Sequence, residues 1–274
     1  MPGGAKKSLG QNYLVNNSVA LRIVEALRPE PGELVFEIGS GKGALTAHLA
    51  RSGAMTVSLE IDRELCAELS GRFAGTDNVE ILNADVRELD FDRETRKRGR
   101  TSCKIIGNIP YMLTSSILIK IPDSVSALCS VIMVQKEVAE RLLEEPGSRN
   151  CGVMTIYLGS YLRTEKVMNV GAGSFYPRPA VDSTVCRFFP LELEGAPEDR
   201  KLFLRFLKKA FSKRRKKLRN ALLDSGARQK RRIQEEIEKQ AGIDMNRRPE
   251  NLILKEWFML FKSYKNIVGL NETC

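Results

Sequence analysis

Apolar positions follow two different patterns along the chain. In the first two-thirds, short runs rich in valine, isoleucine and leucine alternate with longer segments whose apolar residues recur every three or four positions. The short runs are typical of buried strands, and the longer segments are typical of amphipathic helices. Their alternation predicts a parallel sheet with helices on both faces. We expect strands at residues 34–38, 55–60, 79–82, 103–107 and 128–134, and helices at residues 18–27, 44–51, 63–73, 115–121 and 137–144.

The pattern changes after Pro146 and Gly147. Residues 153–163, 165–170 and 184–189 have the composition of strands, and no helical pattern separates them. Strands without crossover helices predict an antiparallel edge on the sheet.

A linker divides the chain into two predicted domains. Residues 190–199 combine proline, glycine and four acidic residues, and a helical pattern then continues to about residue 265. We therefore expect an α/β domain at residues 1–190 and an all-α domain at residues 198–274.

The charge of the chain points to a polyanionic partner. The formal net charge is +10, and each cation that neutralises a phosphate releases a condensed counterion. We expect nucleic acid rather than anionic lipid. Between residues 200 and 232, fifteen lysines and arginines accompany one acidic residue, with apolar residues among them at helical spacing. This composition predicts amphipathic helices with a phosphate-contacting face. The candidate residues on that face are Arg214, Arg215, Lys216, Lys217 and Arg219.

Cysteine and histidine usage excludes several other chemistries. The six cysteines lack the close pairs of a zinc site and the density of a disulfide scaffold, so we expect reduced thiols and no metal. The one histidine, His48, has apolar neighbours in an expected helix, which favours a packing role. No apolar run approaches the roughly 18 residues of a membrane span, and no apolar signal core is present. We therefore expect a cytoplasmic protein.

A glycine-rich loop follows the first expected strand. Residues 36–44 read FEIGSGKGA, in which Gly39 and Gly41 let the backbone turn tightly and approach a ligand. Such a loop cradles a nucleotide-like cofactor. The same residues satisfy the G-x-G-x-x-A fingerprint, so the loop alone does not separate a nicotinamide oxidoreductase from a methyltransferase.

Acidic residues follow the next two expected strands. Glu60 closes the second strand, where a carboxylate accepts hydrogen bonds from ribose hydroxyls in both cofactor classes. Asp85 follows the third strand and is placed to accept the exocyclic amine of a cofactor's adenine. The alternatives are a surface charge for Glu60 and a turn cap for Asp85.

The fourth expected strand runs into Asn108, Ile109, Pro110 and Tyr111. An adenine amine is a weak nucleophile, because its lone pair is delocalised into the ring. The side-chain oxygen of Asn108 and the carbonyl of Ile109 can accept hydrogen bonds from the amine and localise that lone pair. Pro110 stiffens the turn, and Tyr111 offers a flat face for the base. The alternative is an ordinary turn, which the preceding loop and acids make a weaker interpretation.

A second aromatic element, FYPRP, begins at Phe175. We expect Phe175 to stack on the other side of the target base, since such stacking contributes about 1–3 kcal/mol per base. For Tyr176 the alternative is a ring packed in the core.

Together these strings resemble the ribosomal RNA adenine dimethyltransferases of the KsgA type, over nearly the full length of the chain. The two strings nearest the C-terminus are the most specific, because generic methyltransferases lack them. Apart from Glu60 and Asp85, the matching strings are KSLGQNYL at residues 7–14, EIGSGKGALT at 37–46, NIPY at 108–111, FYPRPAVDS at 175–183, AFSKRRKKLRN at 210–220 and RPENL at 248–252.

The resemblance implies a Rossmann-like class I methyltransferase fold, with a seven-stranded, mostly parallel sheet and a small C-terminal all-α domain. It implies S-adenosyl-L-methionine as the cofactor, and N6,N6-dimethylation of two adjacent adenosines near the 3′ end of small-subunit (16S) rRNA during ribosome biogenesis. Residues 1–190 would be catalytic, residues 198–274 would bind RNA or the ribosome, and the chain would act as a monomer. The implied cofactor residues are Gln11, Asn12, Leu14, Gly39, Gly41, Glu60, Asp85 and Asn108, and the catalytic residues are Asn108, Ile109, Pro110, Tyr111 and Phe175.

Some positions depart from the family pattern, and some alternatives stay open. Tyr13 replaces the usual phenylalanine, Ile109 replaces leucine, and Met112 and Leu113 replace the frequent Asn-Ile pair. A large-subunit rRNA methyltransferase of the antibiotic-resistance type shares the NIPY-type motif, although its tail usually differs. A catalytically silent assembly or transcription factor could share the fold, but the intact Asn108 argues against lost catalysis.

Overall fold

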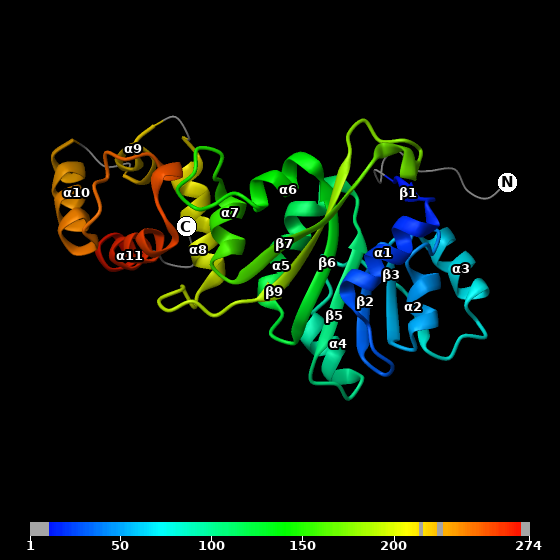
Figure 1. Ribbon diagram of the computed structural model, residues 1–274. Coiled ribbons are helices and arrows are strands. Elements are labelled where there is room, and N and C mark those ends of the chain that lie inside the picture. The colour runs from blue at the N-terminus through cyan, green and yellow to red at the C-terminus, as the bar shows by residue number, and fades with distance from the viewer. Residues whose placement is uncertain (1–10, 214–215, 224–226, 270–274) are drawn as a thin grey trace. The chain divides into compact units, whose positions relative to one another are not determined.

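The chain forms two compact units (Figure 1). The computed structural model describes residues 11–213, 216–223 and 227–269. The first unit combines residues 1–140 with 163–190, and the second combines residues 141–162 with 191–274. The domain boundary expected at residue 190 coincides with a boundary between the units. Residues 141–162, which we expect with the sheet, instead belong to the second unit.

A seven-stranded sheet in the order β4-β3-β2-β5-β6-β9-β7 forms the centre of the first unit. β2 pairs in parallel with β3 and β5, β3 pairs in parallel with β4, and β5 pairs in parallel with β6. β9 runs antiparallel to β6, so the expected α/β class and the antiparallel edge are both confirmed. The strands are β2 (Leu34–Ile38), β3 (Met55–Glu60), β4 (Val79–Asn83), β5 (Cys103–Asn108), β6 (Ala127–Gln135), β7 (Leu162–Val170) and β9 (Ser183–Pro190).

A separate two-stranded sheet lies in the same unit. β1 (Tyr13–Leu14) runs antiparallel to β8 (Phe175–Tyr176). Tyr13 lies opposite Tyr176, and Leu14 lies opposite Phe175. The pair joins the segment before the first helix to the FYPRP element.

Helices connect the strands of the sheet. Among them, α4 is not predicted by the sequence pattern, because Phe91 is the one large apolar residue in FDRETRK. The side chain of Asp90 caps α4 by accepting a hydrogen bond from the Arg93 N–H at 2.9 Å. The helices that begin in this unit are α1 (Asn17–Leu27), α2 (Thr46–Ser52), α3 (Arg63–Arg72), α4 (Phe91–Lys97), α5 (Thr114–Asp123) and α6 (Lys136–Leu142).

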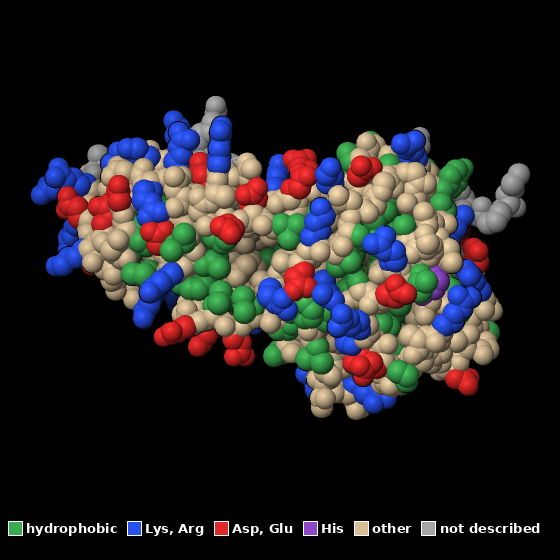
Figure 2. Space-filling view, in the orientation of Figure 1, with side chains coloured by type: hydrophobic (Ala, Val, Ile, Leu, Met, Phe, Trp, Pro, Cys, Tyr) green, Lys and Arg blue, Asp and Glu red, His purple; other side chains and the backbone are tan. Residues whose placement is uncertain are grey.

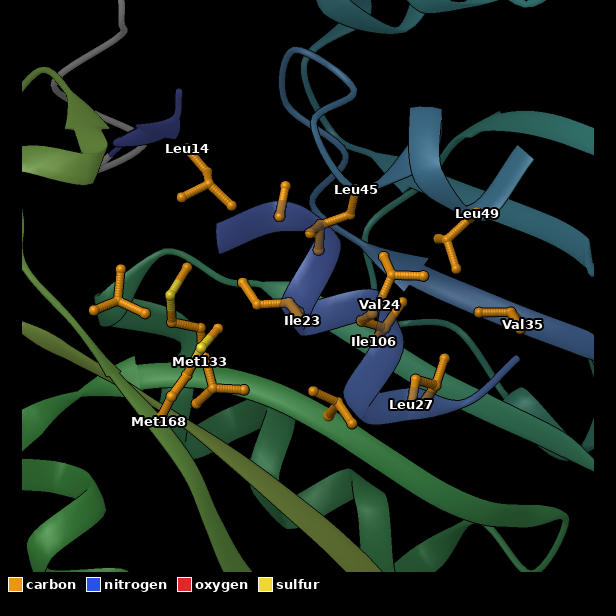
Figure 3. Packing of buried hydrophobic residues seen from close by; sticks show 14 of the residues in the cluster. Leu14, Ile23, Val24, Leu27, Val35, Leu45, Leu49, Ile106, Met133 and Met168 are labelled. Carbon is orange, nitrogen blue, oxygen red and sulfur yellow. The ribbon is translucent and has the colours of Figure 1, made fainter. Parts of the chain in front are cut away.

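Alternate residues of β2 face helices on opposite sides of the sheet. Val35 belongs to the buried cluster that includes Ile23 and Val24 of α1 (Figure 3). Phe36 faces the other side, where its ring centroid lies 5.3 Å from that of Phe91 in α4. Full burial of one such side chain contributes about 1.5–3 kcal/mol. Burial on both faces therefore fixes β2, and with it the start of the glycine loop.

The described residues of the second unit are mainly helical and pack around an aromatic core. Its helices are α7 (Val153–Gly159), α8 (Arg200–Phe211), α9 (Leu218–Leu222), α10 (Ala227–Ala241) and α11 (Leu254–Tyr264). The ring of Phe206 in α8 lies 6.0, 5.4 and 5.2 Å from the rings of Trp257, Phe261 and Tyr264 in α11. The apolar stripe expected in the tail is thus buried.

One expected element has the wrong type. The pattern of residues 153–163 predicts a strand, but Val153–Gly159 form helix α7. Oγ1 of Thr155 accepts a hydrogen bond from the Gly152 N–H at 3.1 Å and donates to the Arg141 carbonyl at 2.8 Å. α7 also packs against α8. Tertiary packing therefore overrides the strand propensity of valine, threonine, isoleucine and tyrosine here.

Candidate active site

The carboxyl ends of the parallel strands open onto a cavity of about 300 Å³ in the first unit. Ligands bind at this edge in open α/β sheets. All eight residues expected to bind the cofactor line the cavity, as do four of the five expected catalytic residues. These residues come from separate parts of the sequence. They are Gln11, Asn12, Leu14, Gly39, Gly41, Glu60, Asp85, Asn108, Ile109, Pro110 and Tyr111.

The glycine loop lies against β3 and α3. Gly41 has a φ of 55°, in the left-handed region that favours glycine. Its N–H donates to Glu60 Oε2 at 2.8 Å. A Cβ atom on Gly43 would lie 2.8 Å from Leu69 Cδ2, so the loop passes too close to α3 for a side chain. Gly43 thus fixes the loop against α3, while Gly39 and Gly41 line the cavity.

Glu60 presents a fixed carboxylate to the cavity. It ends β3 and is 5% exposed. Besides the Gly41 N–H on Oε2, its Oε1 accepts the Asp62 N–H at 3.0 Å. Each carboxylate oxygen has about two acceptor positions, so both oxygens retain one for a ribose hydroxyl. The residue fits a nucleoside cofactor.

Asp85 is paired with Arg87, a residue that the sequence analysis does not single out. Nε and Nη2 of Arg87 donate to Asp85 Oδ2 at 2.9 and 2.5 Å. These hydrogen bonds hold the pKa of the Asp85 carboxyl below its usual value. The Arg87 side chain is 54% exposed, and solvent weakens an ion pair at such a position. The pair thus lies at the solvent-exposed rim of the cavity.

Glu37 is a second residue of the cavity that the sequence analysis does not assign. It is 1% exposed, and its Oε2 accepts hydrogen bonds from Thr46 Oγ1 at 2.6 Å and Ser58 Oγ at 2.5 Å. Burial raises the pKa of the Glu37 carboxyl, and the charge of nearby Glu60 acts in the same direction. The signal in the sequence is an acid inside an otherwise apolar strand, since glutamate is almost never fully buried without partners.

Asn108 lies at the end of β5, where the cofactor-binding and catalytic assignments overlap. Its Nδ2 donates to the Asn12 carbonyl at 3.3 Å. This contact uses the nitrogen of the amide, so the oxygen is the atom left to serve as the acceptor that the proposed chemistry requires. The next residue, Ile109, is 1% exposed, so its side chain anchors the turn.

Tyr111 begins a short 3₁₀ helix over Tyr111–Leu113. Its hydroxyl lies 2.8 Å from Oγ of Ser183, the first residue of β9. Burial raises the pKa of the Tyr111 phenol, so the ring is uncharged near neutral pH. Met112, one of the departures from the family pattern, lines the cavity and is 67% exposed.

Phe175 is the one expected catalytic residue that the structure places away from the cavity. Phe175 is 4% exposed, does not line the cavity, and belongs to the same buried cluster as Leu14. Tyr176, for which core packing is the alternative interpretation, is 67% exposed. Successive side chains of a strand point to opposite faces, so β8 buries one ring and exposes the other. Tyr176 is therefore the exposed ring of this element, and the stacking role of Phe175 stays a prediction.

The basic tail is only partly described. Arg214 and Arg215 lie outside the described residues. Lys216 and Lys217 are exposed, and Arg219 is half-buried. Figure 2 shows lysine and arginine side chains over α9 and α10, with acidic side chains among them.

The remaining expectations concern membrane, metal, histidine and cysteine. No helix within the described ranges is long and apolar enough to span a membrane. Those ranges also contain no group of three or more His, Cys, Asp and Glu side chains arranged to hold a metal.

The five cysteines placed there are free and buried. Nε2 of His48 lies 2.9 Å from Asn17 Oδ1, and His48 is 7% exposed. The histidine therefore packs between α2 and α1.

Known proteins resemble the chain over nearly its full length. Residues 4–266 match the family model described as ribosomal RNA adenine dimethylase. The chain is 37% identical to "Ribosomal RNA small subunit methyltransferase A" of Moorella thermoacetica, over 95% of this chain and 93% of that protein. It is 35% identical to the protein of the same name from Pseudomonas fluorescens, over 93% of this chain and 92% of the relative.

Two solved structures share the fold. A dimethyladenosine transferase from Plasmodium falciparum has a TM-score of 0.76 at 24% identity, over 93% of this chain and 98% of its own. The 23S rRNA methyltransferase ErmE has a TM-score of 0.65 at 24% identity, over 93% of this chain and 100% of its own. These likenesses confirm the Rossmann-like methyltransferase fold. By the extent of the family match, the chain belongs to the ribosomal RNA adenine dimethylase family.

Proposed function

We propose that this protein transfers methyl groups from S-adenosyl-L-methionine to the N6 atoms of two adjacent adenosines near the 3′ end of small-subunit rRNA. The observation that carries the proposal is the place of Asn108. It lies at the end of β5, in one cavity with Glu60, Asp85 and Tyr111. The relatives from Moorella thermoacetica and Pseudomonas fluorescens carry a name with the same substrate class.

Different cavity residues would hold different parts of the cofactor. When bound, the cofactor supplies a methyl group on a sulfonium centre. The Glu60 carboxylate would accept hydrogen bonds from the ribose hydroxyls, and Asp85 would accept one from the exocyclic amine of the adenine. The glycine loop, whose Gly39 and Gly41 line the cavity, would hold the rest of the cofactor. Gln11, Asn12 and Leu14 line the same cavity and would contact the cofactor there.

The turn after β5 prepares the target amine. The Asn108 Oδ1 and the Ile109 carbonyl accept hydrogen bonds from the amine and localise its lone pair. Tyr111 stacks on the base, with its ring oriented by the contact between its hydroxyl and Ser183. Alignment of amine and methyl group is worth about 7–11 kcal/mol in favourable cases. The methylated ammonium loses its proton to water, so no strong general base is required.

The positive charge of the chain supports an RNA substrate. The net charge is +10, and fifteen of the basic residues lie between residues 200 and 232. We infer that these residues contact the phosphates of the rRNA or of a partly assembled small subunit. The chain acts as a monomer in the cytoplasm under this proposal.

The direct test is methyl transfer from labelled S-adenosylmethionine to undermethylated small subunits. Large subunits and duplex DNA serve as parallel substrates, and the labelled nucleosides are then identified. Dimethyladenosine in small-subunit RNA alone is the expected result. Label in the large subunit would instead indicate the resistance-type enzyme. RNA binding without any transfer would indicate an assembly factor.

A further inference from the structure

Lys120 of α5 donates to three backbone carbonyls of a single loop. Its Nζ lies 3.0 Å from the carbonyl oxygen of Val86, 2.7 Å from that of Arg87 and 2.7 Å from that of Leu89. A lysine ammonium has three N–H donors and no acceptor. The three carbonyls therefore use the full donor capacity of Lys120.

The loop that Lys120 holds is the loop that carries Asp85. It follows β4 and turns back on itself, with the Glu88 N–H donating to the Asp85 carbonyl at 3.0 Å. Asp85, Val86 and Arg87 all line the cavity. Because three carbonyl dipoles of this loop converge on one cation, loss of the ammonium would remove a hydrogen-bond partner from all three.

The helix that carries Lys120 also belongs to the target side of the cavity. α5 begins at Thr114, directly after the Tyr111–Leu113 turn. Ile117 of the same helix lines the cavity. One helix therefore connects the turn that holds the target base with the loop that holds the cofactor's adenine.

We propose that Lys120 is a positioning residue for cofactor binding, which fixes the loop of residues 85–89 so that the Asp85 carboxylate meets the adenine amine. The inference rests on the proposed function, because it assigns Asp85 to the adenine of S-adenosylmethionine. Lys120 acts through the loop and does not touch the reacting atoms.

The chain offers a matched control in Lys104. Its Nζ donates to the Arg28 carbonyl at 2.7 Å and to Glu33 Oε2 at 2.6 Å, and its side chain is 14% exposed. Lys104 is thus another partly buried lysine that holds a backbone carbonyl, but it does not line the cavity and its two hydrogen bonds lie away from residues 85–89. A general effect of losing a buried ammonium would appear in both variants.

The test is the affinity for S-adenosylmethionine, measured by titration calorimetry on the full chain. Lys120→Met keeps the length of the side chain and removes the three donors. We expect it to weaken cofactor binding about tenfold, which corresponds to the loss of one net hydrogen bond to an ordered group. The kcat at saturating cofactor should stay within about twofold of wild type. Lys104→Met should bind the cofactor as wild type does, even where it lowers the melting temperature.

Two further variants make the outcome decisive. Lys120→Arg keeps the charge, but a planar guanidinium spreads its N–H donors over three nitrogens and cannot direct three of them from one point to three carbonyls, as an ammonium does. We therefore expect about threefold weaker binding. In an Asp85→Asn background, Lys120→Met should cost much less affinity than it does alone, because two residues acting on one interaction are not additive.

The possible failures are distinguishable. A wild-type chain that does not bind S-adenosylmethionine would overturn the proposed function. Normal wild-type binding, with unchanged affinity in both Lys120 variants, would overturn the role of Lys120 alone. Equal losses in Lys120→Met and Lys104→Met, or full additivity with Asp85→Asn, would do the same.

Discussion

The amide nitrogen of Asn108 lies 3.3 Å from the carbonyl oxygen of Asn12, so the N-terminal segment orients the residue at the end of β5. Asn108→Ala removes both this contact and the proposed acceptor for the target amine. We expect methyl transfer to fall by at least about 100-fold, as when a single aligned hydrogen-bonding group is removed from an active site. Cofactor affinity should weaken only in part, because Glu60 and Asp85 remain. Transfer at the wild-type rate in the Asn108→Ala variant would contradict the proposed site.

Glu37 should make the stability of the protein depend on pH. Burial raises its pKa in the folded state, so ionisation is less favourable when the chain is folded than when it is unfolded. The free energy of unfolding should therefore fall as the pH rises from the unfolded value of about 4.5 toward the raised folded value. Glu37→Gln removes this titration, and urea denaturation across that range would show a flatter profile.

A comparison of charge-matched variants isolates this effect. Glu192→Gln makes the same change of charge at an exposed position, and its pH profile should follow that of the wild type. Parallel profiles for all three proteins would show that Glu37 does not titrate differently in the folded chain.

The two neighbouring aromatic residues of β8 should respond oppositely to truncation. Phe175 is buried, so Phe175→Ala should lower the free energy of unfolding by about 3–5 kcal/mol. Tyr176 is exposed, so Tyr176→Ala should change it by no more than about 0.5 kcal/mol. Urea denaturation of the two variants measures both values. A stable Phe175→Ala variant that fails only in RNA methylation would restore the stacking role expected from the sequence.

Neutralising the basic tail should weaken RNA binding and make the binding constant less dependent on salt concentration. Replacement of Arg214, Arg215, Lys216 and Lys217 by glutamine removes the charges of up to four phosphate-binding side chains. The slope of the logarithm of the binding constant against the logarithm of salt concentration should become shallower by about 0.7–0.9 for each phosphate that is no longer neutralised. Filter binding at several salt concentrations measures this slope.

The helix α4 provides a control with the same change of charge. Arg93, Arg96, Lys97 and Arg100 are exposed in and just after α4, and their replacement by glutamine should leave the slope less affected. An unchanged slope in the tail variant would remove the tail from the RNA interface.

The sequence predicted best the elements whose limits are set by local apolar pattern and by glycine or proline at their ends. The strand at residues 34–38 was predicted to the residue, because an apolar run ends at the glycine loop. Asn108 and Glu60 could be proposed because polar residues at strand ends meet at one edge of a parallel sheet. Their common cavity follows from topology, which local pattern does not determine.

Other features depend on contacts between distant residues. α7 has the composition of a strand and becomes a helix through its packing against α8. In a strand of two residues, the alternation of apolar and polar positions is too short to predict whether Phe175 or Tyr176 faces the core. Lys120 is one of 44 lysines and arginines, and only the convergence of three carbonyls on its ammonium distinguishes it.

The assignment of residues 141–162 to the second unit has a consequence for engineering the gene. Ile156, Tyr157 and Leu158 of α7 are each at most 1% exposed, and α8, which packs against α7, is encoded beyond residue 190. A stop codon at that point would leave the α7 segment in the product and delete the helix that covers it. The shortened polypeptide should therefore expose an apolar helix and aggregate, so truncation after residue 190 would not yield the first unit alone.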